Sequence, residues 1–145
     1  MVLGIGEGKI ELTLDKTAYS PEETIKGKLN ISLNQPTSAR QLVVEFFGEV
    51  RVRSGKNSHI ERVNETKKTI SGDKNYANGE TYDFELVVPS DVLPKKQGGV
   101  IVSLMNFFNP IPTFYVNAYL DMPMKFDMSK KVAIQIVPIK PNMGI

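Results

Sequence analysis

Apolar and polar residues alternate one by one along most of this 145-residue chain. In TIKGKLNISL (24–33), the apolar residues, Ile25 and Leu29 among them, alternate with polar residues. Gly27 takes one position on the apolar face. A strict period of two predicts a β-strand with one face buried and the other in water. The pattern recurs in five further segments and, more weakly, around residues 60–70, which predicts about seven strands: KIELTL, QLVVEFFGEVRVR, TYDFELVV, TFYVNAYLD and KVAIQI.

The segments between these strands have the composition of turns, and no stretch shows a helical period. One-sided strands must bury their apolar faces against each other, which favours two packed sheets. The sequence therefore predicts an all-β fold, an immunoglobulin-like β-sandwich of two antiparallel sheets. We expect a single domain over residues 1–145, with a flexible leader (1–8) and a frayed tail (139–145). The turn sequences are Ser20-Pro21-Glu22-Glu23, Asn34-Gln35-Pro36, Ser54-Gly55-Lys56-Asn57, Asn78-Gly79 and Leu93-Pro94.

The composition narrows the range of functions. Lys and Arg number 18 against 16 Asp and Glu, a net charge of +2, which is too balanced to indicate nucleic-acid binding. There is no Cys, which excludes disulfides, thiolate nucleophiles and Cys-ligated metals. The N-terminus has no signal-peptide pattern, and no apolar run is long enough for a spanning helix. We therefore expect a cytoplasmic protein.

Candidate catalytic and metal-binding residues are few. The one histidine, His59, lies in the loop-like SGKNSHIER, where a surface position is expected. The carboxylates are scattered singly, without calcium-loop spacing and without a pair suited to glycoside chemistry. The glycines of GIGEG (4–8) lack dinucleotide-loop spacing and fit a leader. The sequence thus predicts no catalytic residues, no cofactor and no metal, and we do not expect an enzyme.

Two pairs of basic residues each lie on the outer face of a predicted strand. Lys26 and Lys28 share one strand, and Arg51 and Arg53 share another. Such a patch could bind phosphate groups on a protein or a lipid. The alternative is scattered charge on a face in water.

Four apolar or aromatic residues are also assigned to outward positions, where Glu45 is expected as well. Outward apolar side chains indicate either a covered face or an interaction patch. The four are Val43, Phe47, Tyr115 and Tyr119.

The stretch VIVSLMNFFNPIP (100–112) runs thirteen residues without a charge. Alternation at its start predicts a further strand over residues 100–104, followed by a turn. As an interaction loop it would offer large apolar contacts to a partner. As a membrane contact it would dip into lipid while Lys95 and Lys96 meet anionic headgroups. The candidate partner-binding residues are Leu104, Met105, Phe107, Phe108 and Ile111.

Three stretches resemble the arrestin-like family, and together they run over nearly the whole chain. LDKTAYSPEETIKGKLNISL (14–33) is similar to the family's opening hairpin, Leu-Asp-Lys … Tyr-x-Pro-Gly-Glu … Gly. ARQLVVEFFGEVRVR (39–53) is similar to the α-arrestin strand Arg-x-Leu-x-Val-x-Phe-x-Gly-Glu-x-x-Val. The third stretch joins GETYDFELVVPSDVLP (79–94) with FYVNAYLDMPMKFDMSKKVAIQI (114–136), and it resembles two later family strands. The leader GIGEGKIEL also resembles the start of bacterial sporulation-control proteins of the same superfamily.

The resemblance implies an arrestin N-terminal-domain fold and an adaptor or scaffold rather than an enzyme. We expect protein partners, or a homo-oligomer formed through an apolar edge strand and the loop 100–112. The alternatives are a peripheral membrane-binding module, with weak anionic membrane contact, and a ligand-binding or enzymatic β-sandwich. Family members usually have Pro-Gly-Glu in the first turn, whereas this chain has Glu22, which predicts a turn without positive φ there.

Overall fold

The computed structural model of the chain describes residues 8–92, 112–123 and 128–138. Within these residues the secondary structure is entirely β and contains no helix. Residues 1–7 of the predicted leader (1–8), the apolar residues 100–111 and the tail (139–145) lie outside the described residues, while Gly8 begins a strand. The described strands are β1 (Gly8–Leu14), β2 (Ala18–Tyr19), β3 (Thr24–Leu33), β4 (Thr37–Ala39), β5 (Gln41–Ser54), β6 (Asn57–Ser71), β7 (Lys74–Tyr76), β8 (Thr81–Val87), β9 (Thr113–Asp121) and β10 (Met128–Ile136).

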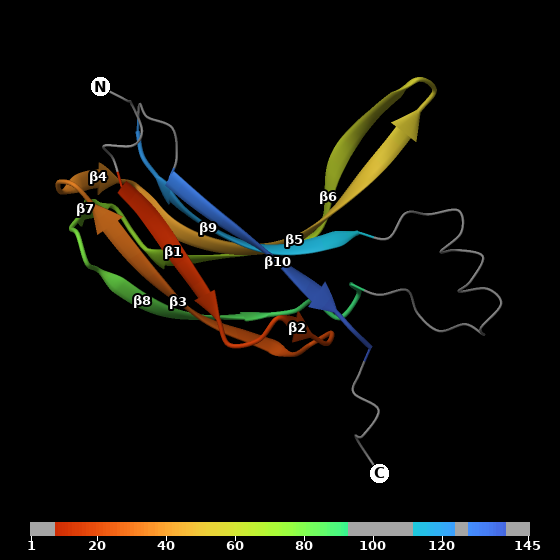
Figure 1. Cartoon of the computed structure of the whole chain (residues 1–145), viewed down its shortest axis with the longest axis horizontal. Helices are drawn as coiled ribbons and strands as arrows, with labels where there is room; N and C mark the ends of the chain where they lie inside the picture. The colour runs from red at the N-terminus through yellow and green to blue at the C-terminus, as the bar shows by residue number, and fades with distance from the viewer. Residues whose placement is uncertain (1–7, 93–111, 124–127, 139–145) are drawn as a thin grey trace, which may run out of the picture.

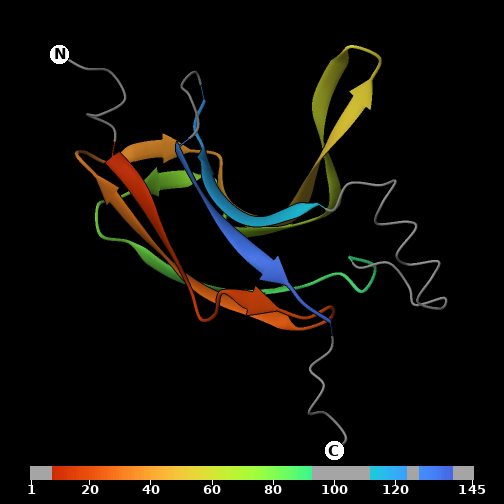
Figure 2. The ribbon, with the colours of Figure 1, turned by 45° about the vertical axis from the view of Figure 1, so that its right-hand side comes forward.

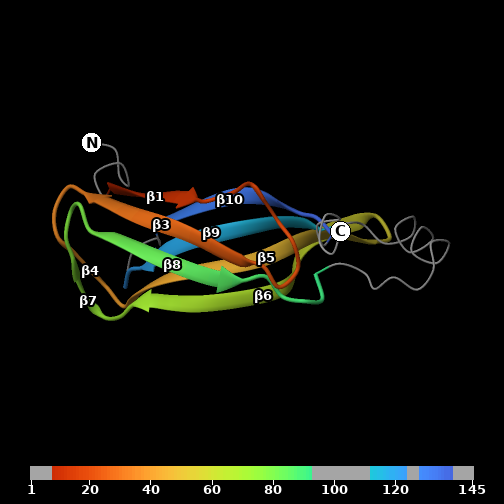
Figure 3. The same ribbon diagram turned by 90° about the horizontal axis from the view of Figure 1, so that it is seen from below.

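Two main sheets pack face to face (Figures 1 and 2). One has the strand order β1-β3-β8 and the other β2-β10-β9-β5-β6, while β4 and β7 form a small third sheet. Seen from below, β1, β3 and β8 lie across the strands of the five-stranded sheet (Figure 3). The pairing is antiparallel except between β10 and β2, which run parallel over two residues. The predicted sandwich is confirmed, and this short parallel contact is its one departure from a purely antiparallel design among the described strands.

The core lies between the two main sheets and is built from the alternating apolar residues of both. Ile25, Leu29 and Ile31 of β3 are fully buried. Phe46 of β5 stacks on Phe114 of β9 with ring centroids 5.5 Å apart. Burying a side chain of this size contributes about 1.5–3 kcal/mol relative to leaving it in water. The period of two therefore identified the face of each strand that makes the core.

Strands β5 and β6 are the longest, with 14 and 15 residues, and they form one hairpin whose far end projects from the sandwich (Figure 1). We call residues 50–63 the arm. The prediction of a loop around His59 is wrong, because His59 pairs with Val52 within the hairpin. The arm extends past the core, so neither of its faces is buried in the sandwich, and the alternation that continues through Val52 on β5 is weak on β6. Its tip is a two-residue loop in which Gly55 has a φ of 62°, as a type II′ turn requires.

A β-bulge separates the arm from the rest of β6. The register shifts between the pairs Phe46–Thr66 and Gly48–Val63, so that Asn64 and Glu65 together oppose Phe47. Asn64 has a φ of 55°, a left-handed conformation that Asn tolerates better than most residues. A bulge bends its strand and increases the local twist. The bend in Figure 1 therefore has an identifiable cause in the sequence.

The first turn corrects one expectation from the sequence. Glu22 has a φ of 69°, although its side chain predicted a turn without positive φ. The Glu23 amide donates to the Ser20 carbonyl at 3.0 Å, and the Glu22 amide donates to the Val88 carbonyl at 2.9 Å. Proline at the second turn position and positive φ at the third define a type II turn. Backbone bonds to the neighbouring strand end hold Glu22 in a conformation that favours glycine.

Replacing Glu22 by glycine is expected to raise the free energy of unfolding by about 1 kcal/mol, because a left-handed residue with a Cβ costs about that much. Urea denaturation of the wild type and E22G measures the difference. E22A is the matched control: it keeps the Cβ and the strain, so it should show no gain. Equal stability of the glycine and alanine variants would contradict the prediction.

Candidate functional site

The face of the five-stranded sheet that points away from the core carries an unusual set of side chains. We call it the outer face. The cross-strand pairs on it are Val43 with Tyr119, Glu45 with Asn117, and Phe47 with Tyr115. Residues directly opposite each other on antiparallel strands share one face of the sheet. The register thus brings together all four outward apolar residues noted in the sequence.

The four outward residues do not all follow the same alternative. Val43 and Phe47 are buried, with 3% and 0% of their surface exposed, so they belong to a covered face. Tyr115 and Tyr119 are half-buried and remain accessible. The Phe47 and Tyr115 rings lie 5.7 Å apart between centroids. The outer face is therefore neither a fully wet surface nor a second complete core.

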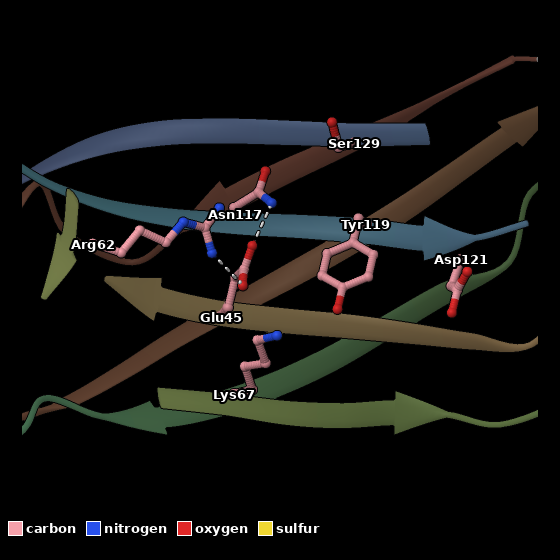
Figure 4. A pocket seen from close by; sticks show the side chains of 7 residues that line it. All are labelled: Glu45, Arg62, Lys67, Asn117, Tyr119, Asp121 and Ser129. Carbon is pink, nitrogen blue, oxygen red and sulfur yellow. Dashed lines mark hydrogen bonds and ion pairs between the residues drawn. The ribbon is translucent and has the colours of Figure 1, made fainter. Parts of the chain in front are cut away.

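Glu45 is at the centre of this face, and its burial was not predicted. Only 2% of its surface is exposed, although the alternating pattern assigned it to the face that points away from the core, where exposure to solvent was expected. Its Oε1 accepts a hydrogen bond from Arg62 Nη1 at 3.0 Å, and its Oε2 accepts one from Asn117 Nδ2 at 2.8 Å (Figure 4). A buried carboxylate of this kind must be paired and hydrogen-bonded. Its position between the apolar Val43 and Phe47 was the one signal of burial in the sequence.

Arg62 connects the arm to the outer face. It pairs with Glu49 across the hairpin, which places it on the same face as Phe47. Its guanidinium lies 3.8 Å from the Phe47 ring centroid, and its Nη1 also donates to Glu65 at 2.8 Å. Burial lowers the pKa of Arg62, but its hydrogen bonds to Glu65 and Glu45 outweigh that effect and raise the pKa. Arg62 therefore remains charged and gives Glu45 a lasting partner.

A hollow of about 400 Å³ opens beside this ion pair. Its walls come from four strands of the sheet, and it carries two basic and two acidic side chains (Figure 4). The Asp121 carboxylate is held by Arg40 Nη2 at 2.8 Å. A hollow that is open and mostly polar suits polar side chains of another molecule better than an apolar small ligand, which favours enclosure. The lining residues are Glu45, Arg62, Lys67, Asn117, Tyr119, Asp121 and Ser129.

Tyr115 forms a further aromatic contact on the same face, outside the lining of the hollow. Lys131 Nζ lies 4.4 Å from the Tyr115 ring centroid and 3.6 Å from Glu49 Oε2. The charged end of this lysine is thus held over an aromatic ring, as in a cation–π contact. The outer face combines aromatic surface with charges of both signs.

Comparison with known proteins identifies the family to which this architecture belongs. Residues 8–95 match the family model for the N-terminal domain of arrestin, also called S-antigen. This match spans more than half of the chain. The chain belongs to the arrestin family.

A solved structure with the same fold is Spo0M, a sporulation control protein from Bacillus subtilis, with a TM-score of 0.67 and 18% sequence identity. The match covers 90% of this arrestin domain and 49% of Spo0M, so the chain spans about half the length of that protein. No curated protein sequence matches the chain significantly. The arrestin-like fold expected from the sequence is confirmed.

The arrestin fold separates the two basic pairs predicted from the sequence. Lys26 and Lys28 lie on β3 of the three-stranded sheet, where Lys28 Nζ is 4.0 Å from Asp83 Oδ1. Arg51 and Arg53 lie on β5 of the other sheet, and Arg51 Nη1 donates to Ser58 Oγ at 3.2 Å. The two pairs therefore form separate surfaces rather than one patch.

The predicted apolar partner-binding residues cannot be placed on this fold. Leu104, Met105, Phe107, Phe108 and Ile111 all lie outside the described residues, and their role stays a prediction. Residues 8–92, 112–123 and 128–138 contain no group of three or more His, Asp or Glu side chains placed to hold a metal ion. The same part of the arrestin domain contains no helix of the length and apolarity needed to cross a membrane.

Proposed function

We propose that this arrestin domain is an adaptor that binds a protein partner on the outer face of its five-stranded sheet. Arrestin-like proteins are in general non-enzymatic and bind protein partners. The observation that carries the proposal is the pair of half-buried tyrosines on this face: Tyr119 lines the hollow at Glu45, and Tyr115 lies against Phe47. Accessible aromatic side chains that gather near a buried carboxylate indicate an interaction patch rather than a face that only meets water.

The chemistry of the outer face fits a polypeptide partner. Protein interfaces concentrate aromatic residues and Arg at their centre and polar groups at their rim. Tyr115 and Tyr119 supply aromatic surface with a polar tip, while Lys67 and Asp121 present opposite charges at the edge of the hollow. The hollow carries Arg62 and Lys67 against Glu45 and Asp121, so it has no net charge. We therefore infer a partner segment with polar side chains of both signs rather than a strongly acidic or basic one.

Other parts of the proposal rest on the sequence. A cytoplasmic location and an additional contact through the loop 100–112 remain proposals of this kind. Membrane attachment and ligand binding or catalysis remain alternatives that no described contact favours.

A photo-crosslinking experiment tests the outer face. p-Benzoylphenylalanine replaces Tyr119 in one variant and Lys28 of β3, on the opposite sheet, in the control. In lysate of the source cells, the label at position 119 should give a defined protein adduct that the label at position 28 does not. Excess unlabelled wild type should compete for the partner and suppress the adduct. Unlabelled K67E should need about a tenfold higher concentration for the same suppression, as for a residue that contributes to an interface. Equal adducts from both positions would overturn the proposal.

A further inference from the structure

We propose that two copies of this chain pair antiparallel through the free edge of β6 in the arm, about a two-fold axis at Ile60. This contact uses the backbone edge of β6 and is centred on Ile60, which does not line the hollow on the outer face; Arg62 contributes its backbone to the edge and its side chain to the hollow. It therefore does not depend on the partner proposed above. Three independent features of the arm lead to it.

The first feature is an open strand edge. β6 is the last strand in the order of its sheet, and β5 is its neighbour on the other side. Side chains 57–62 are all exposed. Ile60 is 48% exposed and, with Val87, is one of two large apolar side chains in the described residues that are open to water. An exposed edge with unpaired backbone groups invites pairing with another strand.

The second feature is the direction of the backbone groups. The two-residue loop at the tip is closed by the pair Ser54–Asn57, which in such hairpins exchanges hydrogen bonds. Because these pairs alternate along an antiparallel ladder, Asn57, His59 and Glu61 direct their N–H and C=O groups toward β5. Ser58, Ile60 and Arg62 therefore direct theirs to the free edge. These three residues are symmetric about Ile60, as a two-fold pairing requires.

The third feature is the match between side chains. With the two-fold axis at Ile60, each His59 lies opposite Glu61 of the second copy. Ile60 lies opposite Ile60 of the second copy, on the other face of the paired strands. His59 Nε2 and Glu61 Oε2 are already 2.8 Å apart within one copy, so both side chains occupy the same face. Imidazole can donate to the facing carboxylate, and the two isoleucines exclude water from each other. Opposite partners of this kind stabilise paired strands.

Neighbouring registers lack this match. An axis at Glu61 places two glutamates opposite each other, and an axis at Arg62 places two arginines opposite each other, which is unfavourable. An axis at His59 gives two facing histidines. An axis at Ser58 runs the ladder into the loop at Gly55. The register centred on Ile60 is thus the one that places no two like ionisable side chains opposite each other on the axis.

The two ends of the regular part of β6 in the arm also place the centre of the pairing at Ile60. The turn ends at Asn57 and the bulge begins at Asn64, so the regular segment is 57–63 with Ile60 at its midpoint. The Arg51 side chains of the two copies would be three strand spacings apart, about 14 Å. That separation exceeds the Debye length of about 8 Å at physiological salt, so their repulsion is weak. A contact this small forms a concentration-dependent dimer rather than a permanent one.

Two measurements test the pairing. Sedimentation equilibrium of the wild type should show a monomer–dimer equilibrium that I60K weakens at least about tenfold, because two lysines then meet on the axis. H59E should weaken it similarly, and H59E/E61H should restore it, because unlike groups face each other again in the same register. Circular dichroism should show all variants folded, since these side chains are exposed.

The absence of cysteine in the chain permits a direct test of register. Facing residues in a hydrogen-bonded antiparallel pair have Cα atoms about 5.5 Å apart, within reach of a disulfide. I60C should therefore form a disulfide-linked dimer under mild oxidation, and K56C at the exposed tip should not. A monomer at every concentration, or equal crosslinking of both variants, would overturn the proposal. Adduct formation from position 119 should be unchanged by I60K, so failure of this inference is distinct from failure of the adaptor proposal.

Discussion

Replacing Arg62 by methionine is expected to lower the free energy of unfolding by about 3 kcal/mol or more, as for other buried carboxylates that lose their ion partner. Methionine retains much of the packing on Phe47 but leaves Glu45 with Asn117 as its hydrogen-bond donor. Glu45 is 2% exposed while Arg62 covers it, so removing the guanidinium leaves a carboxylate in a site that is shielded from water on its other sides. Chemical denaturation of R62M and wild type at neutral pH measures the loss.

Two controls separate this ion pair from general effects of losing an arginine. R40M removes the exposed partner of Asp121 and should cost less than about 1 kcal/mol, as surface ion pairs do. The double variant E45Q/R62M removes the buried charge together with its partner and should recover roughly half of the loss. If R62M cost no more than R40M, the buried pair would not hold the outer face together.

The strands that form the core were predictable because each buries one face and leaves the other in water. β3, with Ile25, Leu29 and Ile31 buried, shows this rule in full. β2, β4 and β7 were not predicted, because two or three residues are too few to display a period. The arm was not predicted in full either, since a hairpin beyond the core has no apolar face to reveal it.

The site was only partly predictable for a related reason. The outward Val43 and Phe47 indicated a covered or interacting face, which the structure resolves as covered at these two positions. Glu45 was expected to be exposed to solvent, because alternation distinguishes the two faces of a strand. It does not tell whether the face away from the core is exposed or covered. The partner of Glu45 is 17 residues away, across a bulge that depends on a left-handed Asn64. No local pattern encodes that contact.

The second large effect concerns the inward glycines. Replacing Gly27 by alanine is expected to lower the free energy of unfolding by about 3 kcal/mol, near the upper end for overpacking a core. A Cβ at position 27 would lie 2.4 Å from Phe84 Cζ and 2.8 Å from the carbonyl oxygen of Thr13. The glycine thus leaves room for the Phe84 ring between the sheets. Urea denaturation of G27A measures the loss.

Gly48 provides the matched comparison, because a Cβ there would meet side chains rather than backbone. Its nearest atoms would be Phe114 Cε1 at 2.8 Å and Pro112 Cβ at 3.1 Å. Shortening Phe114 to leucine should therefore relieve G48A, so that G48A/F114L costs clearly less than the sum of its single variants. The same cycle with G27A and F84L should show weaker relief, because the Thr13 carbonyl belongs to β1 and can move only with its strand. Full relief in both cycles would mean that ring contact alone, and not the approach of the β1 backbone, makes glycine necessary at position 27.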